Sequence, residues 1–290
     1  MLAGRATAFT TAAMVAFAAN SWLCRFALRG GGIDPLMFTA VRLLSGAAVL
    51  WPLARGLEPR GARGGSWTTG AALVVYAVAF SLAYVSLDTG VGAFLLFGAV
   101  QATMIGAGLF QGERPGPRQW TGLGAAIAGL GWLAAPGFAA TGHAAPGFVA
   151  PLLMATAGVA WGVYSLVGRG RPHPFAATAG NFLRAAPAAL VLLAVSLLTA
   201  AHGQATATGI VLAAVSGAVT SGIGYVLWHA ALRDLSATTA GIVQLAVPAL
   251  AAAGGVILLG ERPTARLLIA GALILGGVAL AVARRRTIRS

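Results

Sequence analysis

The chain has 290 residues, of which 58% are hydrophobic and only 9% are charged, whereas soluble domains devote about a quarter of their residues to Asp, Glu, Lys and Arg. This composition excludes a soluble globular domain, because too few polar side chains are present to cover a water-exposed surface. The net charge of +13 does not indicate nucleic acid binding, because the cations are all Arg and most lie in short connections, where they meet lipid head groups.

Long apolar runs recur along the whole chain and predict membrane-spanning helices. A helix needs about 20 residues to cross the hydrocarbon layer, since each residue rises about 1.5 Å. We therefore expect an all-α integral membrane protein with ten transmembrane helices joined by short turns. In chain order the expected spans are 6–26, 36–54, 67–87, 90–111, 118–135, 147–168, 175–199, 207–231, 236–258 and 264–283.

The first apolar run is expected to remain in the protein as a helix. No convincing small-residue cleavage site follows it, and many more spans do. Its Cys24 is the one cysteine of the chain, so it is interpreted as a small core residue. No metal or cofactor site is expected, because the histidines are scattered over separate elements: His143, His173, His202 and His229.

The distribution of arginines predicts the orientation of the spans. Cytoplasmic loops carry the excess of positive charge, and an even number of spans places both termini on one side. That side holds thirteen of the 19 arginines, so we expect both termini in the cytoplasm. The opposite side holds Arg25, Arg29, Arg262 and Arg266.

Two copies of Gly-Glu-Arg-Pro, at 112–115 and 260–263, indicate an internal repeat, because each precedes a Gly-rich apolar helix. The predicted halves are 1–138 and 145–290, each with five helices, separated by a polar break at 139–146. Because five is an odd number, the second half enters the membrane inverted. Inverted repeats of this kind form a binding site between the halves, near the middle of the membrane, and support alternating access.

Ten spans in two inverted halves, with this motif between the fourth and fifth helix of each half, resemble the drug/metabolite transporter superfamily and its ten-helix EamA-type members. The resemblance covers essentially the whole chain. Within the superfamily, the sequence is most similar to the aromatic amino acid exporters of the bacterial inner membrane. The resemblance implies a multi-pass protein of that membrane, which exports amino acids or related metabolites through a central cavity lined by both halves.

Aromatic residues recur every four positions in the third expected span, at Tyr76, Phe80 and Tyr84, and therefore share one helix face. A matching stripe in the eighth span contains Tyr225 and His229. Lipid-facing aromatics gather at helix ends, so a stripe through the middle indicates either a cavity wall or plain helix packing. A cavity wall of this kind would suit an aromatic amino acid, but it would also suit many other hydrophobic solutes.

Polar side chains inside the spans provide the other candidate contacts, because amides and hydroxyls can hydrogen-bond a zwitterion without adding a permanent charge. Interhelical hydrogen bonding is the equally weighted alternative. Trp22 and Trp161 are similarly ambiguous between packing and cavity. The full set of candidate substrate-binding residues is Asn20, Trp22, Tyr76, Phe80, Tyr84, Gln101, Trp161, Tyr164, Ser165, Tyr225, His229 and Gln244.

All six carboxylates fall at predicted helix ends or in turns, which favours a facilitator or exchanger over a carboxylate-driven antiporter. Glu113 and Glu261, in the repeated motif, are interpreted as turn residues that favour the start of the helix that follows. Arg42 and Arg184 fall within spans and are expected to reach opposite interfaces; binding of a substrate carboxylate is the alternative.

The leading hypothesis is therefore a secondary transporter for aromatic and other hydrophobic amino acids. The rival hypothesis is an efflux transporter for drugs or other small metabolites, with or without coupling to protons. An enzyme is not expected, because no paired carboxylates, metal-ligand cluster or activated nucleophile is present. The expected partners are the small-molecule substrate and membrane lipid, with the protein as a monomer or a weak homodimer.

Overall fold

The computed structural model describes residues 2–29, 31–59, 62, 64–134, 149–199, 205–259 and 265–282. Every regular element within these ranges is a helix, so the all-α prediction is confirmed there. The predicted break at 139–146 and the second Gly-Glu-Arg-Pro motif lie outside the described residues. The helices are α1 (Leu2–Leu28), α2 (Pro35–Leu57), α3 (Trp67–Tyr84), α4 (Thr89–Phe110), α5 (Pro117–Ala134), α6 (Val149–Gly168), α7 (Pro174–Thr199), α8 (Ala207–Val215), the π-helix η1 (Ser216–Ile223), α9 (Gly224–Leu232), α10 (Ala237–Gln244), α11 (Ala246–Leu259) and α12 (Ala265–Val282).

Eight helical segments of the described chain are long and apolar enough to cross a membrane. One of them, Ala207–Leu232, joins α8, η1 and α9, and another, Ala237–Leu258, joins α10 and α11. These eight correspond to all the expected spans except 118–135 and 264–283, where the structure has the 18-residue helices α5 and α12. The expectation of a multi-pass membrane protein is therefore confirmed.

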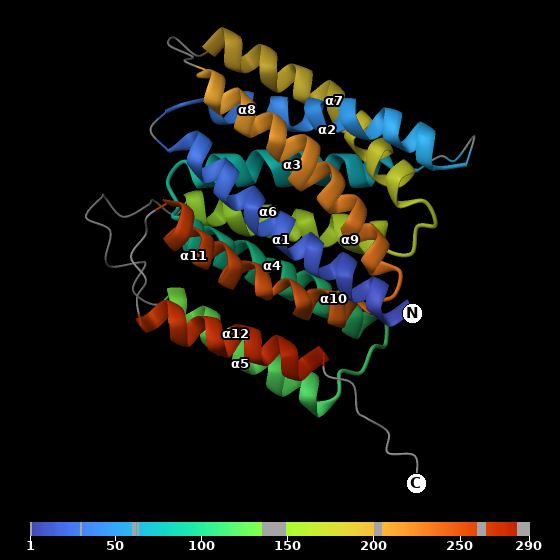
Figure 1. Cartoon of the computed structure of the whole chain (residues 1–290), viewed down its shortest axis with the longest axis vertical. Helices are drawn as coiled ribbons and strands as arrows, with labels where there is room; N and C mark the ends of the chain where they lie inside the picture. Colours follow the sequence, from blue (N-terminus) through green and yellow to red (C-terminus); the bar gives the residue numbers. More distant parts are fainter. Residues whose placement is uncertain are drawn as a thin grey trace.

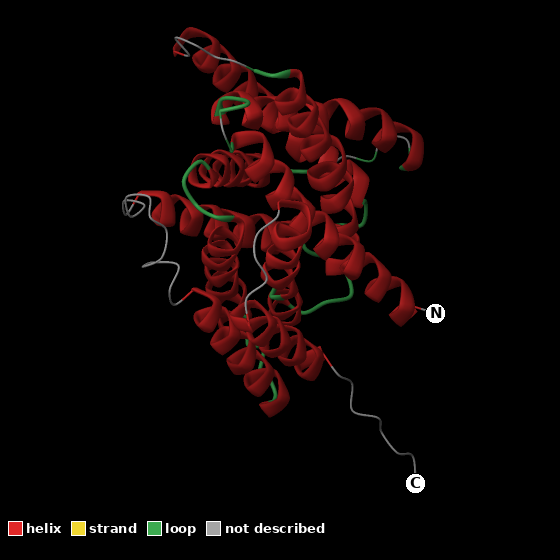
Figure 2. Cartoon of the chain, turned by 60° about the vertical axis from the view of Figure 1, so that its left-hand side comes forward, coloured by secondary structure: helices red, strands yellow, loops and turns green. Residues whose placement is uncertain are grey.

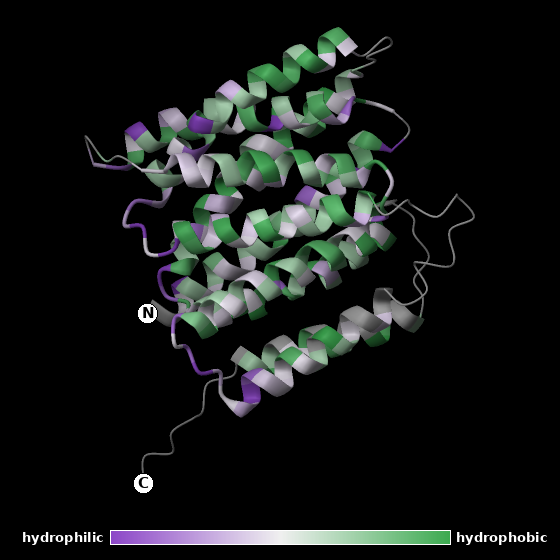
Figure 3. Ribbon diagram, turned by 180° about the vertical axis from the view of Figure 1, so that it is seen from behind, coloured by the Kyte–Doolittle hydropathy of each residue, from purple (hydrophilic) through white to green (hydrophobic). Residues whose placement is uncertain are grey.

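The outer surface of these helices is apolar. Large hydrophobic side chains stand exposed along it, among them Phe110 at 96%, Leu198 at 86% and Ile257 at 78%. Figure 3 shows apolar residues along the helices and hydrophilic residues gathered in the connections. Such a surface is stable against hydrocarbon, in which a helix also satisfies its own backbone hydrogen bonds.

The helices are stacked from one end of the molecule to the other. α2 packs against α7 at one end, and α5 packs against α12 at the other (Figure 1). The same stacking is visible in the turned view of Figure 2. Between the two ends, α3 packs against α6, and α1 packs against α9 and α11. These central helices supply most of the side chains of the candidate site.

Glycines allow two of the central contacts to be very close. A Cβ atom at Gly217 of η1 would lie 2.0 Å from the carbonyl oxygen of Arg42 in α2. A Cβ atom at Gly158 of α6 would lie 2.2 Å from the carbonyl oxygen of Leu96 in α4. Small residues of this kind let membrane helices approach backbone to backbone, so η1 lies directly against the segment of α2 that carries Arg42.

The membrane-length segment Ala207–Leu232 is not a regular α-helix throughout. It changes to π-helix from Ser216 to Ile223 and then returns to α-helix. In a π-helix the hydrogen bonds run from residue i to i+5, and such turns are frequent at functional sites. This one brings Ser216 and Ser221 to the same face, next to α1.

Candidate substrate site

Arg42 lies in the interior of the protein, with none of its surface exposed. Its Nε donates a hydrogen bond to the Ser221 hydroxyl at 2.8 Å, and its Nη2 donates to Tyr76 at 3.1 Å and to Tyr225 at 2.7 Å. The expectation that Arg42 reaches the membrane interface is therefore wrong. Its side chain instead extends towards α3, η1 and α9, because hydroxyl groups on these helices accept hydrogen bonds from its guanidinium.

The positive charge of Arg42 has no carboxylate partner among the described residues. Its guanidinium carbon lies 5.1 Å from the ring centre of Tyr76 and 5.2 Å from that of Phe80, so the charge is stabilised by ring faces and neutral hydroxyls. Its Nη1 has no hydrogen-bond partner in the described chain. The described carboxylates all lie at or just beyond helix ends: Asp34, Glu58, Asp88, Glu113 and Asp234.

Asn20 of α1 joins this cluster from the opposite side. Its Oδ1 accepts hydrogen bonds from Ser216 at 2.6 Å and from Thr220 at 3.1 Å. Its Nδ2 donates to the Tyr76 hydroxyl at 3.3 Å. The π-helical turn therefore connects α1 to the Arg42 cluster through side-chain hydrogen bonds.

Aromatic rings from four elements close around the same region. Trp161 of α6 lies 5.1 Å from Phe17, 5.1 Å from Tyr76 and 4.6 Å from Tyr225, measured between ring centres. The cavity between the rings has a volume of about 10 Å³, roughly the space of one water molecule. It is lined by Phe17, Ser21, Tyr76, Phe80, Leu96, Phe97 and Trp161.

A second polar cluster lies beside the first, where α6 and α9 meet α7. The Tyr164 hydroxyl accepts a hydrogen bond from Asn181 at 3.3 Å. His229 Nδ1 lies 3.1 Å from the Thr178 hydroxyl, and its ring centre lies 5.0 Å from that of Tyr164. Nε2 of His229 is buried without a hydrogen-bond partner in the described chain.

The other candidates hydrogen-bond across neighbouring helices. Gln244 accepts a bond from Trp161 Nε1 at 2.7 Å and donates to the carbonyl of Ala240 at 3.1 Å. Gln101 donates to the Gly241 carbonyl, and Trp228 donates to Ser165 at 3.0 Å. The bond of Gln244 to Ala240 lies within α10, and the other bonds connect neighbouring helices. A substrate role for Gln101, Ser165 and Gln244 stays a prediction.

Trp22 and Tyr84 lie outside the ring of aromatics around Trp161. Trp22 Nε1 donates to the Ala251 carbonyl at 2.8 Å, so its indole packs on α11. Tyr84 contacts Phe80, with 4.7 Å between ring centres, and its hydroxyl donates to the Thr89 carbonyl at 3.3 Å. The structure thus brings Asn20, Tyr76, Phe80, Trp161, Tyr164 and Tyr225 into one central region.

Arg42 and Phe17 lie in this region but outside the set of candidate residues, and for Arg42 the binding of a substrate carboxylate was the alternative expectation. Arg42 carried a usable signal, because it lies about two turns inside its span, where a charged side chain is costly. Phe17 lies three residues before Asn20 and therefore shares its helix face, but an apolar residue in an apolar run gives no signal of its own.

Glu113 of the repeated motif binds the start of α10. Its carboxylate accepts hydrogen bonds from the amides of Ala237 and Thr238, each at 2.9 Å, and pairs with Arg169 at 3.3 Å. Burial raises the pKa of this carboxyl, but the hydrogen bonds from Thr238, Ala237 and Arg169 outweigh burial and lower the pKa to about 2. The expectation that Glu113 serves the helix that follows it is wrong, because its carboxylate caps a helix from the other half of the chain.

Comparison with known proteins identifies the family. Residues 149–283 match the model of the EamA-like transporter family. An uncharacterized protein of Pseudomonas aeruginosa is 49% identical over 286 residues, covering 97% of this chain and 96% of its own length. A crystal structure has the same fold, with a TM-score of 0.76 at 23% identity over 97% of this chain and 98% of that one. The chain therefore belongs to the EamA-like family of membrane transporters for small molecules.

Proposed function

We propose that the protein is a secondary transporter that exports aromatic and other hydrophobic amino acids, or related metabolites with a carboxylate, across the bacterial inner membrane. The observation that carries the proposal is the buried guanidinium of Arg42, which lies among aromatic rings and has no carboxylate partner in the described chain. A carboxylate and an aromatic ring are the two groups that such a site recognises.

The carboxylate end of the substrate is assigned to Arg42. Guanidinium binds carboxylate with two parallel hydrogen bonds, and charge-assisted bonds are about twice as strong as neutral ones. Nη1 is free of hydrogen bonds within the described chain, and Nη2 needs only to release one of its two tyrosine hydroxyls. A permanently cationic drug is disfavoured at this position, because it would meet an uncompensated positive charge.

The ring of the substrate is assigned to the aromatic wall of Phe17, Tyr76 and Trp161. Ring contacts of this kind add about 0.5 to 1.5 kcal/mol beyond burial of the apolar surface. The ammonium group of an amino acid would meet neutral acceptors such as Ser21, whose side chain lines the same cavity. Amino acids and simple aromatic carboxylates are therefore both within the proposed substrate class.

We propose that the chain folds as ten transmembrane helices in two inverted repeats. The packing partners support this arrangement, because they occur in matching pairs. α2 packs against its proposed counterpart α7, and α5 against its counterpart α12. The contact of α3 with α6 is matched by that of α9 with α1, and the contact of α4 with α6 by that of α11 with α1.

Alternating access is part of the proposal, and the closed centre supports it. A cavity of about 10 Å³ holds no amino acid, so α1, α3, α6 and α9 must separate to admit one from either side. The excess of arginines on the side of the termini supports a cytoplasmic location for both ends. The proposed route lies within one chain, so a monomer is sufficient for transport.

Counterflow of labelled Phe in proteoliposomes tests the proposal. Unlabelled Phe and 3-phenylpropionate should compete for the carrier, whereas phenethylamine, which lacks the carboxylate, should not. Arg42→Gln should weaken transport about 10- to 100-fold, since hydrogen bonds to charged groups contribute about 1.5 to 3 kcal/mol. Arg42→Lys keeps the charge but loses the planar fork and should give an intermediate loss.

Arg233→Gln is the matched control, because it removes an exposed arginine and should leave counterflow unchanged. Thermal unfolding of each purified variant separates loss of transport from loss of folding. Absence of counterflow for every amino acid and carboxylate would overturn the proposed substrate class. Efficient competition by phenethylamine would instead overturn the role of Arg42.

A further inference from the structure

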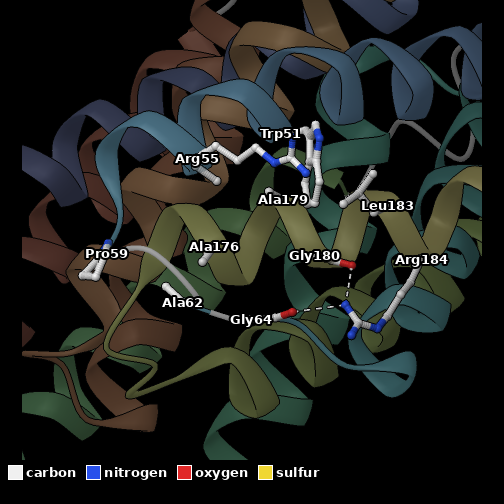
Figure 4. A pocket seen from close by; sticks show the side chains of 11 residues that line it. Trp51, Arg55, Pro59, Ala62, Gly64, Ala176, Ala179, Gly180, Leu183 and Arg184 are labelled. Carbon is white, nitrogen blue, oxygen red and sulfur yellow. Dashed lines mark hydrogen bonds between the residues drawn. The ribbon is translucent and has the colours of Figure 1, made fainter.

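A large pocket opens on the outer surface between α2 and α7, away from the Arg42 cluster. Its volume is about 580 Å³. Figure 4 shows Trp51 and Arg55 from the end of α2 on one wall and Arg184 of α7 on another. The remaining lining is formed by Ala54, Pro59, Ala62, Gly64, Ala176, Ala179, Gly180 and Leu183.

The two arginines leave the pocket positively charged. Arg55 stacks over the Trp51 ring, with its guanidinium carbon 4.2 Å from the ring centre. Arg184 donates from Nη1 to the carbonyl oxygens of Gly64 at 3.1 Å and Gly180 at 2.8 Å. Neither arginine pairs with a carboxylate among the described residues, and both hydrogen-bond acceptors of Arg184 are neutral carbonyl groups.

The acidic residue next to the pocket lining in the sequence, Glu58, is bound to other groups. Glu58, which directly precedes the lining residue Pro59, has one carboxylate oxygen 2.7 Å from His173 Nδ1. Its other oxygen accepts the amide of Phe175 at 3.2 Å. The carboxylate is therefore committed to the start of α7, and the positive charges of the pocket remain available to an anion.

Two exposed tryptophans near the pocket indicate the level of the lipid head groups. Trp51 is 42% exposed near the end of α2, and Trp67 is 70% exposed at the start of α3. The guanidinium carbon of Arg184 lies 5.9 Å from the Trp67 ring centre. Exposed tryptophans near helix ends are typical of the membrane–water interface, and Arg184 reaches this level from within α7.

We propose that this pocket binds the phosphodiester head group of an anionic phospholipid. Arg55 and Arg184 bind the phosphate from two different helices, and the exposed side chains of Leu183 and Leu190 on α7 accommodate an acyl chain. A free phosphate offers the same charge, but it makes no use of an apolar wall that faces hydrocarbon. Basic pockets between membrane helices are a recognised form of head-group site.

The bound lipid bridges the end of α2 and the first half of α7. These helices come from different halves of the chain and pack along their lengths. The lipid should therefore raise the thermal stability of the protein, because a ligand that binds only the folded state stabilises it. This inference is independent of the proposed transport substrate.

The test is lipid binding to the purified full-length protein in detergent, measured by native mass spectrometry and by thermal unfolding. The probes are phosphatidylglycerol, phosphatidylcholine and inorganic phosphate. Phosphatidylglycerol should bind and stabilise most strongly. Arg55→Gln should weaken its binding about fivefold, the effect expected for one arginine near a lipid surface, whereas the control Arg233→Gln should bind as the wild type does.

Arg55→Gln is the primary variant because Arg55 makes no hydrogen bond within the described chain that its loss would break. Arg184→Gln also removes the bonds to Gly64 and Gly180, so its unfolding temperature without lipid must be compared first. Equal binding of phosphatidylcholine, equal protection by inorganic phosphate, or unchanged binding by Arg55→Gln would each overturn the proposal. Arg42→Gln should keep the lipid effect, so failure of the transport proposal is distinguishable from failure of this one.

Discussion

Arg42 is held in the interior by groups that carry no charge of their own. An arginine at the centre of a membrane helix costs about 2.5 to 3.5 kcal/mol on the insertion scale. Three hydrogen bonds to hydroxyls and two ring faces are together of comparable size. The neutral surroundings therefore suffice to keep the charge buried, and no described carboxylate competes with the proposed substrate anion for it.

Glu113 is the second residue whose role depends on its partners. The carboxylate accepts hydrogen bonds from backbone amides at the start of α10, which have no partner within that helix. A negative charge there also interacts favourably with the helix dipole. Glu113 lies between α4 and α5, and Arg169 lies between α6 and α7. The same carboxylate therefore links these two connections to the start of α10.

The pKa of Glu113 predicts an acid-sensitive contact. Since the pKa is lowered from an ordinary 4.5 to about 2, the stabilisation is complete above about pH 4.5 and is lost as the pH falls towards 2. The unfolding temperature of the wild type should fall over this window. The unfolding temperature of Glu113→Gln should be lower at neutral pH and should fall less on acidification. The control Asp234→Asn changes an exposed carboxyl on a nearby turn, and its unfolding temperature should follow that of the wild type. Parallel wild-type and Glu113→Gln curves would contradict the assignment.

At the scale of the helices, close backbone contact determines which side chains meet. η1 lies against α2 because Gly217 has no side chain at the contact, and the hydroxyl of Ser221 thereby reaches Nε of Arg42. The π-helical turn adds Ser216 and Thr220 on the side of Asn20. The geometry of one helix segment thus controls both sides of the polar cluster.

Gly217→Ala tests this contact. The new Cβ atom would lie 2.0 Å from the Arg42 carbonyl oxygen, so η1 must move away from α2, at a cost of about 1 to 3 kcal/mol in stability. We expect a lower unfolding temperature and weaker counterflow. Gly124→Ala of α5 is the control, because a Cβ atom there meets nothing within 4 Å, and improved helix propensity should leave stability equal or higher. If Gly217→Ala changed neither the unfolding temperature nor counterflow, the close contact would not be required.

At the scale of the whole molecule, the absence of buried carboxylates from the described spans bears on energy coupling. His229 is the buried side chain among them whose ordinary pKa is nearest neutrality. Proton antiport usually requires a titratable group that alternates between the two sides. The proposed facilitator or exchanger needs no such group, so His229 is the residue at which this part of the proposal is tested.

An imposed pH gradient tests this conclusion. Counterflow of labelled Phe should reach the same plateau with and without the gradient, and His229→Gln should not change that independence. Proteoliposomes with a measured internal pH supply the comparison. Accumulation of Phe driven by the gradient would show proton coupling, and loss of that accumulation in His229→Gln would assign it to this residue.

The sequence by itself determined the membrane class and the positions of the helices. Length and apolarity of a run are local properties, and bilayer thickness sets the length, so eight expected spans reappear as membrane-length helices. The periodic stripe of Tyr76 and Phe80 also indicated an inward face, because side chains four residues apart share a helix face.

Only the tertiary structure decided how the polar residues are used. Arg42 bonds to Ser221 and Tyr225, which are 179 and 183 positions away, and Glu113 caps a helix that starts 124 positions later. Periodicity shows which residues share a helix face, but it does not show which helix lies opposite that face. An arginine inside a span can therefore reach the interface or the centre, and the packing of α3, η1 and α9 around it selects the centre.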